Sequence, residues 1–206
     1  MSNIILIQHC QSEHHITNMS GGWTDTPLTE AGRKQAEMIG EKLINYVDYN
    51  DYVLYSSDLL RASQTAEIIG TKLRLNVIQD KGLREINTGV AAGKTKEWAR
   101  ANRQPRTRSG FDLEYQEFQN GESWREFYSR VCDCMDRIYE REKNKNLLIV
   151  THGGTLSNIL AWWMKFELHM IGNAYFSSSP GGISLLSQNS IQQNIVNKFN
   201  DTSYFD

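Results

Sequence analysis

Short, mainly apolar runs alternate along this chain with longer segments whose apolar residues recur at helical spacing. Each run has about four residues and is bounded by polar or glycine-containing turns. Runs of this kind are typical of strands buried on both faces of a parallel sheet. We expect such strands at 4–7, 52–55, 75–78 and 147–150, and a terminal pair at 182–186 and 191–196 joined through 188–190.

The segments between these runs predict amphipathic helices. The first spans residues 29–45, with Thr29 as its N-cap. The second follows Ser56-Ser57-Asp58, which we expect to cap it. The third begins at Ser123, where Glu126 three residues later completes a capping box. A fourth helix follows the last of the parallel-type strands.

This alternation predicts an α/β fold in three layers, a mainly parallel sheet with helices on both faces. We expect a single domain over residues 1–206, with a small cap insertion at about 90–122 and a loop at 13–22. The cap begins with a basic stretch from Lys94 to Arg108, opposed only by Glu97. Such a stretch is either a solvated face or an attractive surface for an anionic substrate.

Composition and charge exclude several classes of protein. A net charge of −2 provides no general attraction to nucleic acid or membrane. Three cysteines are too few for a disulfide framework or a four-ligand zinc site, so we expect free thiols in a reducing compartment. The N-terminus lacks a signal-peptide pattern, and the apolar run at 159–164 is too short to span a bilayer. We therefore expect a cytoplasmic protein, and the pattern makes no prediction of its oligomeric state.

Polar residues with chemical potential follow three of the predicted strands. His9 and His152 each come directly after a buried strand, and Arg61 lies in the first turn of the helix after the second strand. Ligands of open α/β sheets bind outside the carboxyl ends of the strands, so we expect these three side chains to converge at one edge. One histidine there would be an ordinary core residue, but three converging groups indicate a site, and Arg61 favours an anion.

Several motifs in a fixed order resemble those of a known family. They are Gln8–Ser12, Gly22–Ala36, Ser56–Ala66, Leu83–Ile86 with Gly89 and Gly93 after it, Gly121–Ser123 and Thr151–Gly154. In these motifs the chain resembles the histidine phosphatase superfamily, the group that contains cofactor-dependent phosphoglycerate mutases and many broad phosphatases. The resemblance covers almost the whole chain and implies a phosphoglycerate mutase-like fold.

The resemblance also implies roles for individual residues. His9 would be the nucleophile that forms a phosphohistidine. Glu85 would protonate the leaving oxygen and then activate water, and His152 would stabilise charge on the transferring group. Arg61 would clamp phosphate oxygens. The other implied phosphate-binding residues are Gln8, Ser12 and His15. No metal or cofactor is implied, because cationic side chains neutralise the phosphate.

The chain departs from the family pattern at the reaction centre. Gln8 stands where the family has an arginine, which exchanges a charge-assisted contact for a neutral one. Cys10 replaces a glycine, and we expect its side chain at the pocket. His15 replaces an asparagine and is expected to be cationic at mildly acidic pH. Thr88 and Ala91 replace aromatic residues, so the substrate wall is altered too.

Two classes of function follow from this sequence. The first is a phosphomonoester hydrolase, slow or specialised, that acts on a phosphorylated small molecule through a phosphohistidine on His9. The second is a degenerate member that binds a phosphorylated ligand or a protein partner without efficient turnover. The retained His9, Arg61, Glu85 and His152 favour the enzyme. The short segment between Glu85 and His152 favours a phosphatase over a phosphoglycerate mutase, and the basic stretch is a weak indication of an acidic substrate.

Overall fold

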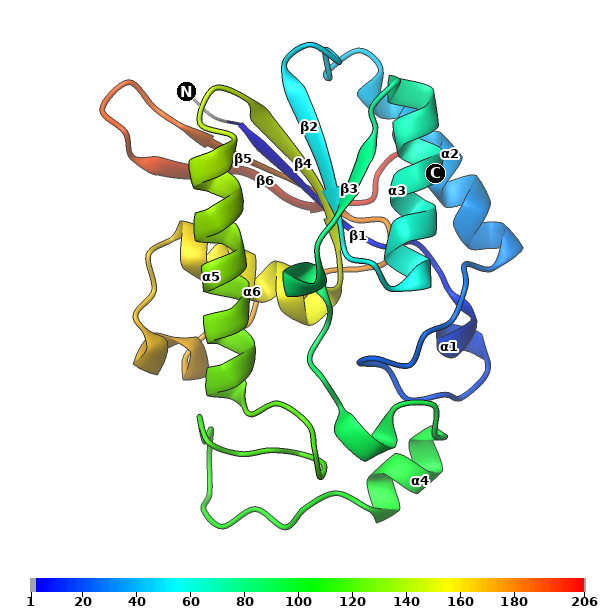
Figure 1. The fold of residues 1–206 in the computed structure, drawn as a ribbon, viewed down its shortest axis with the longest axis vertical. Helices are drawn as coiled ribbons and strands as arrows, with labels where there is room; N and C mark the ends of the chain where they lie inside the picture. Colours follow the sequence, from blue (N-terminus) through cyan, green and yellow to red (C-terminus); the bar gives the residue numbers. More distant parts are fainter. Residues whose placement is uncertain (1–2, 206) are drawn as a thin grey trace.

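A computed structural model describes residues 3–205 and contains a six-stranded sheet with the order β3-β2-β4-β1-β5-β6 (Figure 1). The first four strands in the chain are parallel to one another, β5 runs antiparallel to its neighbour β1, and β6 runs antiparallel to β5. The mainly parallel sheet predicted from the sequence is confirmed. The strands are β1 (Ile4–Gln8), β2 (Tyr52–Ser56), β3 (Val77–Gln79), β4 (Asn146–Thr151), β5 (Ile183–Gln188) and β6 (Asn194–Asp201).

Helices cover both faces of this sheet. In Figure 1, α2 and α3 lie on one side of it, and α5 and α6 lie on the other. The α-helices are α1 (Glu13–Ile16), α2 (Glu30–Leu43), α3 (Leu60–Leu73), α4 (Lys96–Ala101), α5 (Trp124–Arg141) and α6 (Gly153–Trp163). Short 3₁₀ helices occur at η1 (Lys81–Leu83), η2 (Gly89–Ala91) and η3 (Leu168–Gly172).

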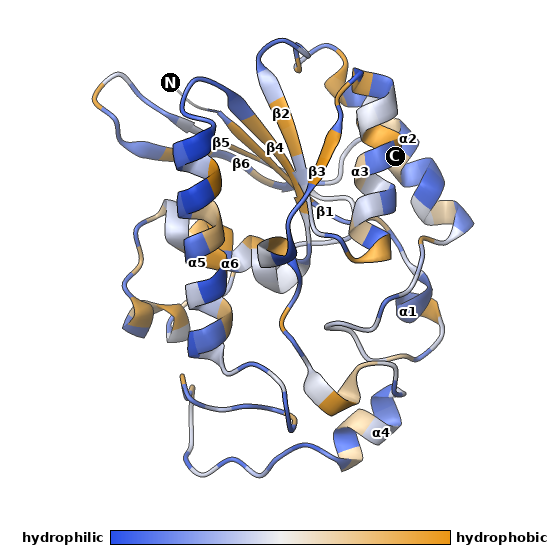
Figure 2. Ribbon diagram, in the orientation of Figure 1, coloured by the Kyte–Doolittle hydropathy of each residue, from blue (hydrophilic) through white to orange (hydrophobic). Residues whose placement is uncertain are grey.

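Alternate residues of β1 supply the two halves of the core. Ile4 and Leu6 belong to the apolar cluster with α5 and α6. Ile5 and Ile7 belong to the cluster with α2 and α3. Burial on both sides explains why the strand is continuously apolar rather than alternating. Figure 2 shows the apolar residues concentrated in the central strands and on the inner faces of the helices.

Two predicted caps have different outcomes. The capping box of α5 is confirmed, because Ser123 Oγ accepts from the backbone N–H of Glu126 and the Glu126 carboxylate accepts from that of Ser123. The predicted cap of α3 is wrong: the N-cap residue is Leu59. Ser57 Oγ accepts from the N–H of the N-cap residue Leu59 at 3.3 Å, and Asp58 forms an ion pair with Arg84 instead.

Other boundaries differ where local turn chemistry decides them. Residues 13–22 include the short helix α1 instead of being loop throughout. The edge strand β3 occupies Val77–Gln79 rather than 75–78. The last strand starts at Asn194 rather than at 191, because Asn189 Oδ1 accepts from the backbone N–H groups of Ile191 and Gln193 and so extends the hairpin turn.

Strand register determines which residues meet at the carboxyl edge of the sheet. Gln8 pairs with Thr151 in β1 and β4, and Ser56 pairs with Val150 in β2 and β4. The residues that follow these three adjacent strands, His9, Ser57 and His152, therefore lie side by side.

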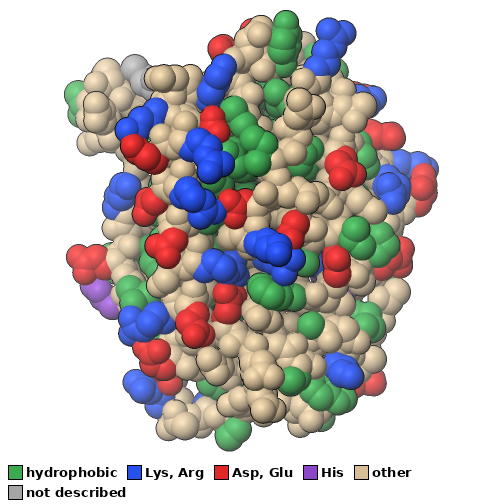
Figure 3. All heavy atoms as spheres, viewed as in Figure 1, with side chains coloured by type: hydrophobic (Ala, Val, Ile, Leu, Met, Phe, Trp, Pro, Cys, Tyr) green, Lys and Arg blue, Asp and Glu red, His purple; other side chains and the backbone are tan. Residues whose placement is uncertain are grey.

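Lysine, arginine, aspartate and glutamate side chains are interspersed over the face of the molecule shown in Figure 3. This distribution agrees with the small net charge. None of the helices between residues 3 and 205 combines the length and the apolarity that crossing a membrane requires.

Helix α2 supports the turn after β1 through a close backbone approach at Gly32. A Cβ on Gly32 would lie 1.9 Å from the Gln11 carbonyl oxygen. We expect Gly32→Ala to push α2 away from this turn and to lower the free energy of unfolding by about 1–3 kcal/mol, measured by urea denaturation. Gly21→Ala is the matched control, because a Cβ there meets nothing within 4 Å. Equal losses in the two variants would contradict the account.

Candidate active site

His9 has a defined hydrogen-bonding state at the end of β1. Its Nδ1 lies 2.8 Å from the Cys10 carbonyl oxygen. Because a carbonyl only accepts, Nδ1 carries the proton and Nε2 keeps its lone pair. Arg61 Nε donates to that Nε2 at 3.1 Å. Burial and the positive charge of Arg61 lower the pKa of His9 well below 6.5, so the imidazole is uncharged at neutral pH.

Arg61 is a buried cation whose other donors are held by backbone carbonyls. The residue is 1% exposed. Nη1 donates to the Thr24 oxygen at 2.8 Å, and Nη2 donates to the Gly22 oxygen at 2.7 Å. Burial lowers its pKa to about 10, which leaves it charged at neutral pH. Among residues 3–205 it makes no ion pair with a carboxylate. Glu85 and Asp25 act on it only from beyond ion-pair distance, and a buried charge without a direct partner is costly, so this position favours a bound anion.

His152 lies across the site from His9, with the ring centroids 5.1 Å apart. Its Nε2 is 2.8 Å from Ser57 Oγ, and its buried Nδ1 has no partner among the described residues. Burial, then Arg61 and His9, lower its pKa well below 6.5. The structure thus brings His9, Arg61 and His152 together as their positions after the strands predict.

The Glu85 carboxylate is held against the first turn of α6 by hydrogen bonds. It accepts from the backbone N–H groups of Gly154 and Ile86, each at 2.9 Å. A Cβ on Gly154 would lie 2.4 Å from Glu85 Oε1, so the family's second glycine leaves room for this carboxylate. The two hydrogen bonds orient the group toward the edge where His152 begins the helix.

A salt bridge that sequence reasoning missed anchors the segment carrying Glu85. Arg130 on α5 pairs with Glu122 at 2.6 and 2.7 Å. The same guanidinium donates to the backbone oxygens of Gly82, Arg84 and Glu85. Charged residues on the surface of a helix usually face solvent, so the position of Arg130 in α5 does not predict that it anchors the segment of Glu85.

Gln8, which stands in the place of the family's arginine, is nearly buried beside the loop after α6. Its Oε1 accepts from Ser178 Oγ at 2.5 Å. Its Nε2 makes no hydrogen bond to the part of the chain that the structure describes. Ser178 lies 170 positions from Gln8 in the sequence, so this contact could not be predicted from the residues near Gln8.

Ser12 and two histidines form a second group around His9. Ser12 N–H donates to His15 Nδ1 at 3.1 Å, and Ser12 Oγ is 2.9 Å from His14 Nδ1. The His15 ring stacks on that of His9, with centroids 5.5 Å apart. In the neutral His15 the proton therefore sits on Nε2, where it is available to a ligand. Ser12 orients both histidines rather than presenting a free hydroxyl.

The surroundings of His15 disfavour its cationic form. Burial, then the charges of Arg61 and Lys96, lower its pKa below 6.5. The ring nitrogens of His9, His14 and His15 lie within 4.8 Å of one another, a spacing that suits a metal ion. The guanidinium in contact with His9 opposes a cation there and favours an anion.

The expectation that the Cys10 side chain lies at the pocket is also wrong. Cys10 is fully buried in the apolar cluster with α2 and α3. Successive residues after a strand point to opposite sides, so the residue after His9 faces the core. Burial raises the pKa of its thiol to about 12, which makes it unreactive. Cys10, Cys132 and Cys134 are all free thiols.

Most of the basic residues between Lys94 and Arg108 are paired or packed on the surface. Arg103 pairs with Glu117, and Arg108 pairs with Asp112. Lys94 lies over the ring of Trp98. These contacts agree with the solvated-face interpretation for the residues involved.

Comparison with known families agrees with the geometry. The model of the histidine phosphatase superfamily (branch 1) matches residues 4–202. The chain belongs to this superfamily. Phosphoglycerate mutase-like protein 4 of Arabidopsis thaliana is 30% identical over 162 residues, which cover 77% of this chain and 69% of that protein. Phosphoserine phosphatase 1 of Hydrogenobacter thermophilus is 31% identical over 153 residues, or 74% of this chain and 71% of that protein.

Solved structures share the histidine phosphatase fold. Bacillus stearothermophilus YhfR superposes with a TM-score of 0.79 over 100% of both chains, at 24% sequence identity. The predicted phosphoglycerate mutase-like fold, with helices on both faces of a mainly parallel sheet, is confirmed.

The histidines of this superfamily member make its stability depend on pH. His9, His14, His15 and His152 all have lowered pKa values, that of His14 at about 3. Below an unfolded pKa of about 6.5 the unfolded chain therefore binds more protons than the folded one, and acid favours unfolding. We expect the melting temperature to be level above about pH 7 and to fall as the pH drops below about 6.5, measured by calorimetry.

A pair of variants isolates this effect. His14→Asn should make the fall in melting temperature below pH 6.5 shallower. His169→Asn is the matched control, because that side chain is 67% exposed and lies outside the site. A melting temperature that does not change between pH 7.5 and 5.0 in the wild type would contradict the assignment of neutral histidines.

Proposed function

We propose that this protein is a phosphomonoester hydrolase and that His9 carries the phosphoryl group during the reaction. The observation that supports it most strongly is the contact between the neutral Nε2 of His9 and Arg61, a buried cation without a carboxylate partner. A phosphate dianion supplies the missing negative charge and brings phosphorus to the lone pair. Membership of a superfamily whose relatives include a phosphoserine phosphatase supports the reaction class.

In the first step, the Arg61 Nε–H stops donating to His9 Nε2 and donates to a phosphate oxygen instead, which frees the lone pair of His9. His9 Nε2 attacks phosphorus, the N–P bond forms, and the bond to the ester oxygen breaks. Glu85 acts as the general acid of this step and gives a proton to the leaving oxygen. Covalent catalysis of this kind divides one difficult displacement into two easier ones.

In the second step, water attacks the phosphohistidine. Glu85, now a carboxylate, takes a proton from that water, the new O–P bond forms, and the N–P bond breaks. His9 recovers its lone pair and Glu85 its proton. His152 stabilises the negative charge that develops on the phosphoryl oxygens in both transition states.

Neutral hydrogen-bond donors replace part of the phosphate contact that the family's arginine would supply. The free Nε2 of Gln8 and the Nε2–H of His15 each offer a hydrogen bond to a phosphate oxygen. Ser12 contributes by orienting His15. Neutral hydrogen bonds are weaker than charge-assisted ones, which is why turnover is expected to be slow.

A second candidate function is binding of a phosphorylated ligand without turnover, and the neutral Gln8 is the observation in its favour. Removal of the nucleophile distinguishes the two functions. We expect His9→Asn to lower kcat for 4-nitrophenyl phosphate by at least about 10³-fold, while the variant still binds inorganic phosphate. His169→Asn is the control for an exposed histidine. Equal rates for His9→Asn and wild type, or no turnover by either, would reject the hydrolase.

The role of Gln8 gives a prediction of its own. Gln8→Arg adds a charge-assisted donor, so we expect kcat/KM for the same ester to rise by about 10²-fold. Gln8→Leu, which has no donor, should lower it. A fall in kcat/KM for Gln8→Arg would mean that the pocket is built around glutamine for a ligand other than a phosphate dianion.

A further inference from the structure

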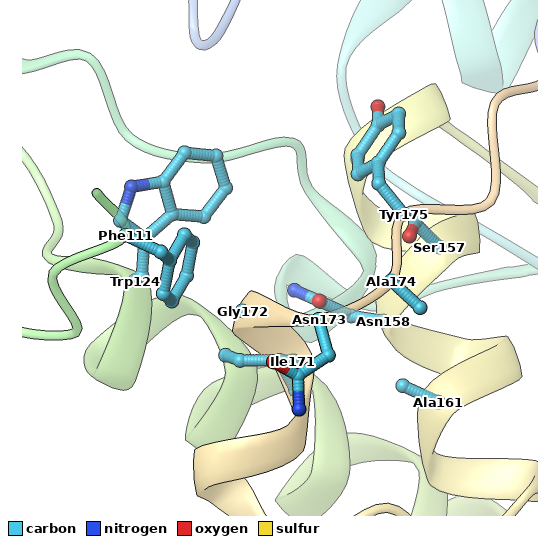
Figure 4. Close-up of a pocket in the computed structure, with 11 residues that line it drawn as sticks. Phe111, Trp124, Ser157, Asn158, Ala161, Ile171, Gly172, Asn173, Ala174 and Tyr175 are labelled. Atoms are coloured by element: carbon cyan, nitrogen blue, oxygen red, sulfur yellow. The ribbon is translucent and has the colours of Figure 1, made fainter.

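A cavity of about 410 Å³ opens beside Glu85, between the start of α5, helix α6 and the segment after it. None of the described residues that line it carries a charge. In Figure 4 the rings of Phe111 and Trp124 stand on one side of it, Tyr175 stands on another, and the Asn158 amide lies between them.

The cavity adjoins the group that would protonate the leaving oxygen. Gly154 lines it and donates its backbone N–H to Glu85 Oε2 at 2.9 Å. Partial desolvation and the nearby negative charge of Glu85 raise the pKa of Tyr175, which also lines the cavity. The part of a substrate that leaves with the ester oxygen would therefore enter this space.

Asn158 supplies an unmet hydrogen-bond donor in this cavity. The residue is 9% exposed, and its buried Nδ2 has no hydrogen-bond partner among residues 3–205. Buried amide donors are nearly always paired in folded proteins. An acceptor atom on a bound molecule would satisfy this one.

The opposite wall is aromatic. The rings of Phe111 and Trp124 lie 5.6 Å apart at 43° to each other. Gly172 packs against the Phe111 ring, where a Cβ would come within 2.6 Å of the ring edge. A wall of two rings favours a flat or apolar group over an anionic one.

The basic residues of the cap do not enter this cavity. Arg106 lies over the ring of Tyr115, and its Nη1 donates to the Gly110 oxygen. Lys96, Arg100 and Arg103 line a different cavity, of about 260 Å³. The indication of an acidic substrate from the basic stretch is therefore not supported at the position of the leaving group.

We infer that the leaving group of the substrate occupies this cavity, carries no negative charge, and has a ring together with an acceptor atom that pairs with Asn158 Nδ2. This inference rests on the proposed hydrolase function, which determines which side of phosphorus the cavity serves. It separates this chain from enzymes whose leaving group carries a carboxylate.

Two esters that differ only in charge test the inference. 4-Carbamoylbenzyl phosphate and 4-carboxybenzyl phosphate have the same shape, and both leave as primary alcohols. We expect kcat/KM for the carbamoyl ester to be at least about tenfold higher, because the cavity has an amide donor and no cation to pair with a carboxylate. Equal values, or a preference for the carboxy ester, would overturn the inference while leaving the hydrolase intact.

A substitution at Asn158 tests the assigned donor. Asn158→Leu keeps a similar volume and removes the amide, so the preference for the carbamoyl ester over unsubstituted benzyl phosphate should fall by about tenfold. Asn45→Ala, at an exposed residue after α2, is the control and should keep the wild-type preference. An unchanged preference in Asn158→Leu would overturn the assignment.

Binding of the free alcohols keeps the two proposals distinguishable. Titration of the protein with 4-(hydroxymethyl)benzamide should shift the indole N–H resonance of Trp124 in NMR spectra, and 4-(hydroxymethyl)benzoate should shift it far less. This result would hold even if neither ester were hydrolysed, which would reject only the hydrolase. Equal shifts with the two alcohols, or none with either, would overturn the leaving-group site.

Discussion

The contact between Arg61 and His9 is the interaction on which the rest of the site depends. The Arg61 guanidinium is 1% exposed and forms no ion pair with a carboxylate of the described chain, so its positive charge is available to a bound anion. Two backbone carbonyls hold it in place, and its remaining Nε–H points at the lone pair of His9. Its charge helps to keep His9 neutral, so the same residue attracts an anion and preserves the nucleophile that would attack it.

The fold maintains this arrangement through supports outside the site. Parallel pairing places the residues after β1, β2 and β4 next to one another. The Arg130–Glu122 pair holds the segment of Glu85 against α5, and the start of α6 orients the carboxylate. The cavity beside Glu85 is lined by Asn158 and two aromatic rings and by no charged residue among those described, which is the basis of the proposed leaving-group selectivity. On the proposed function, charge would recognise the phosphate, and the shape of the cavity with one amide would recognise the rest of the substrate.

The sequence predicted what depends on local pattern. Continuous apolar runs identified the buried strands, and positions after strands identified His9, Arg61 and His152 as neighbours. Glu85 follows no such strand and was found only through the family resemblance. The Cys10 expectation failed because it depends on which way a side chain points. Arg130, Ser178 and Asn158 act through contacts or cavities formed by distant segments, which no local pattern encodes.

The most direct test of the central claim is the position of the phosphoryl group on His9 during turnover. The enzyme would be mixed with a phosphate ester, quenched in alkali, and examined by ³¹P NMR and peptide mapping. Because Nδ1 is held by the Cys10 carbonyl and Nε2 faces Arg61, the account predicts phosphorus on Nε2 of His9. Phosphorus on Nδ1 or on another residue, or ester hydrolysis without any phosphohistidine, would contradict it.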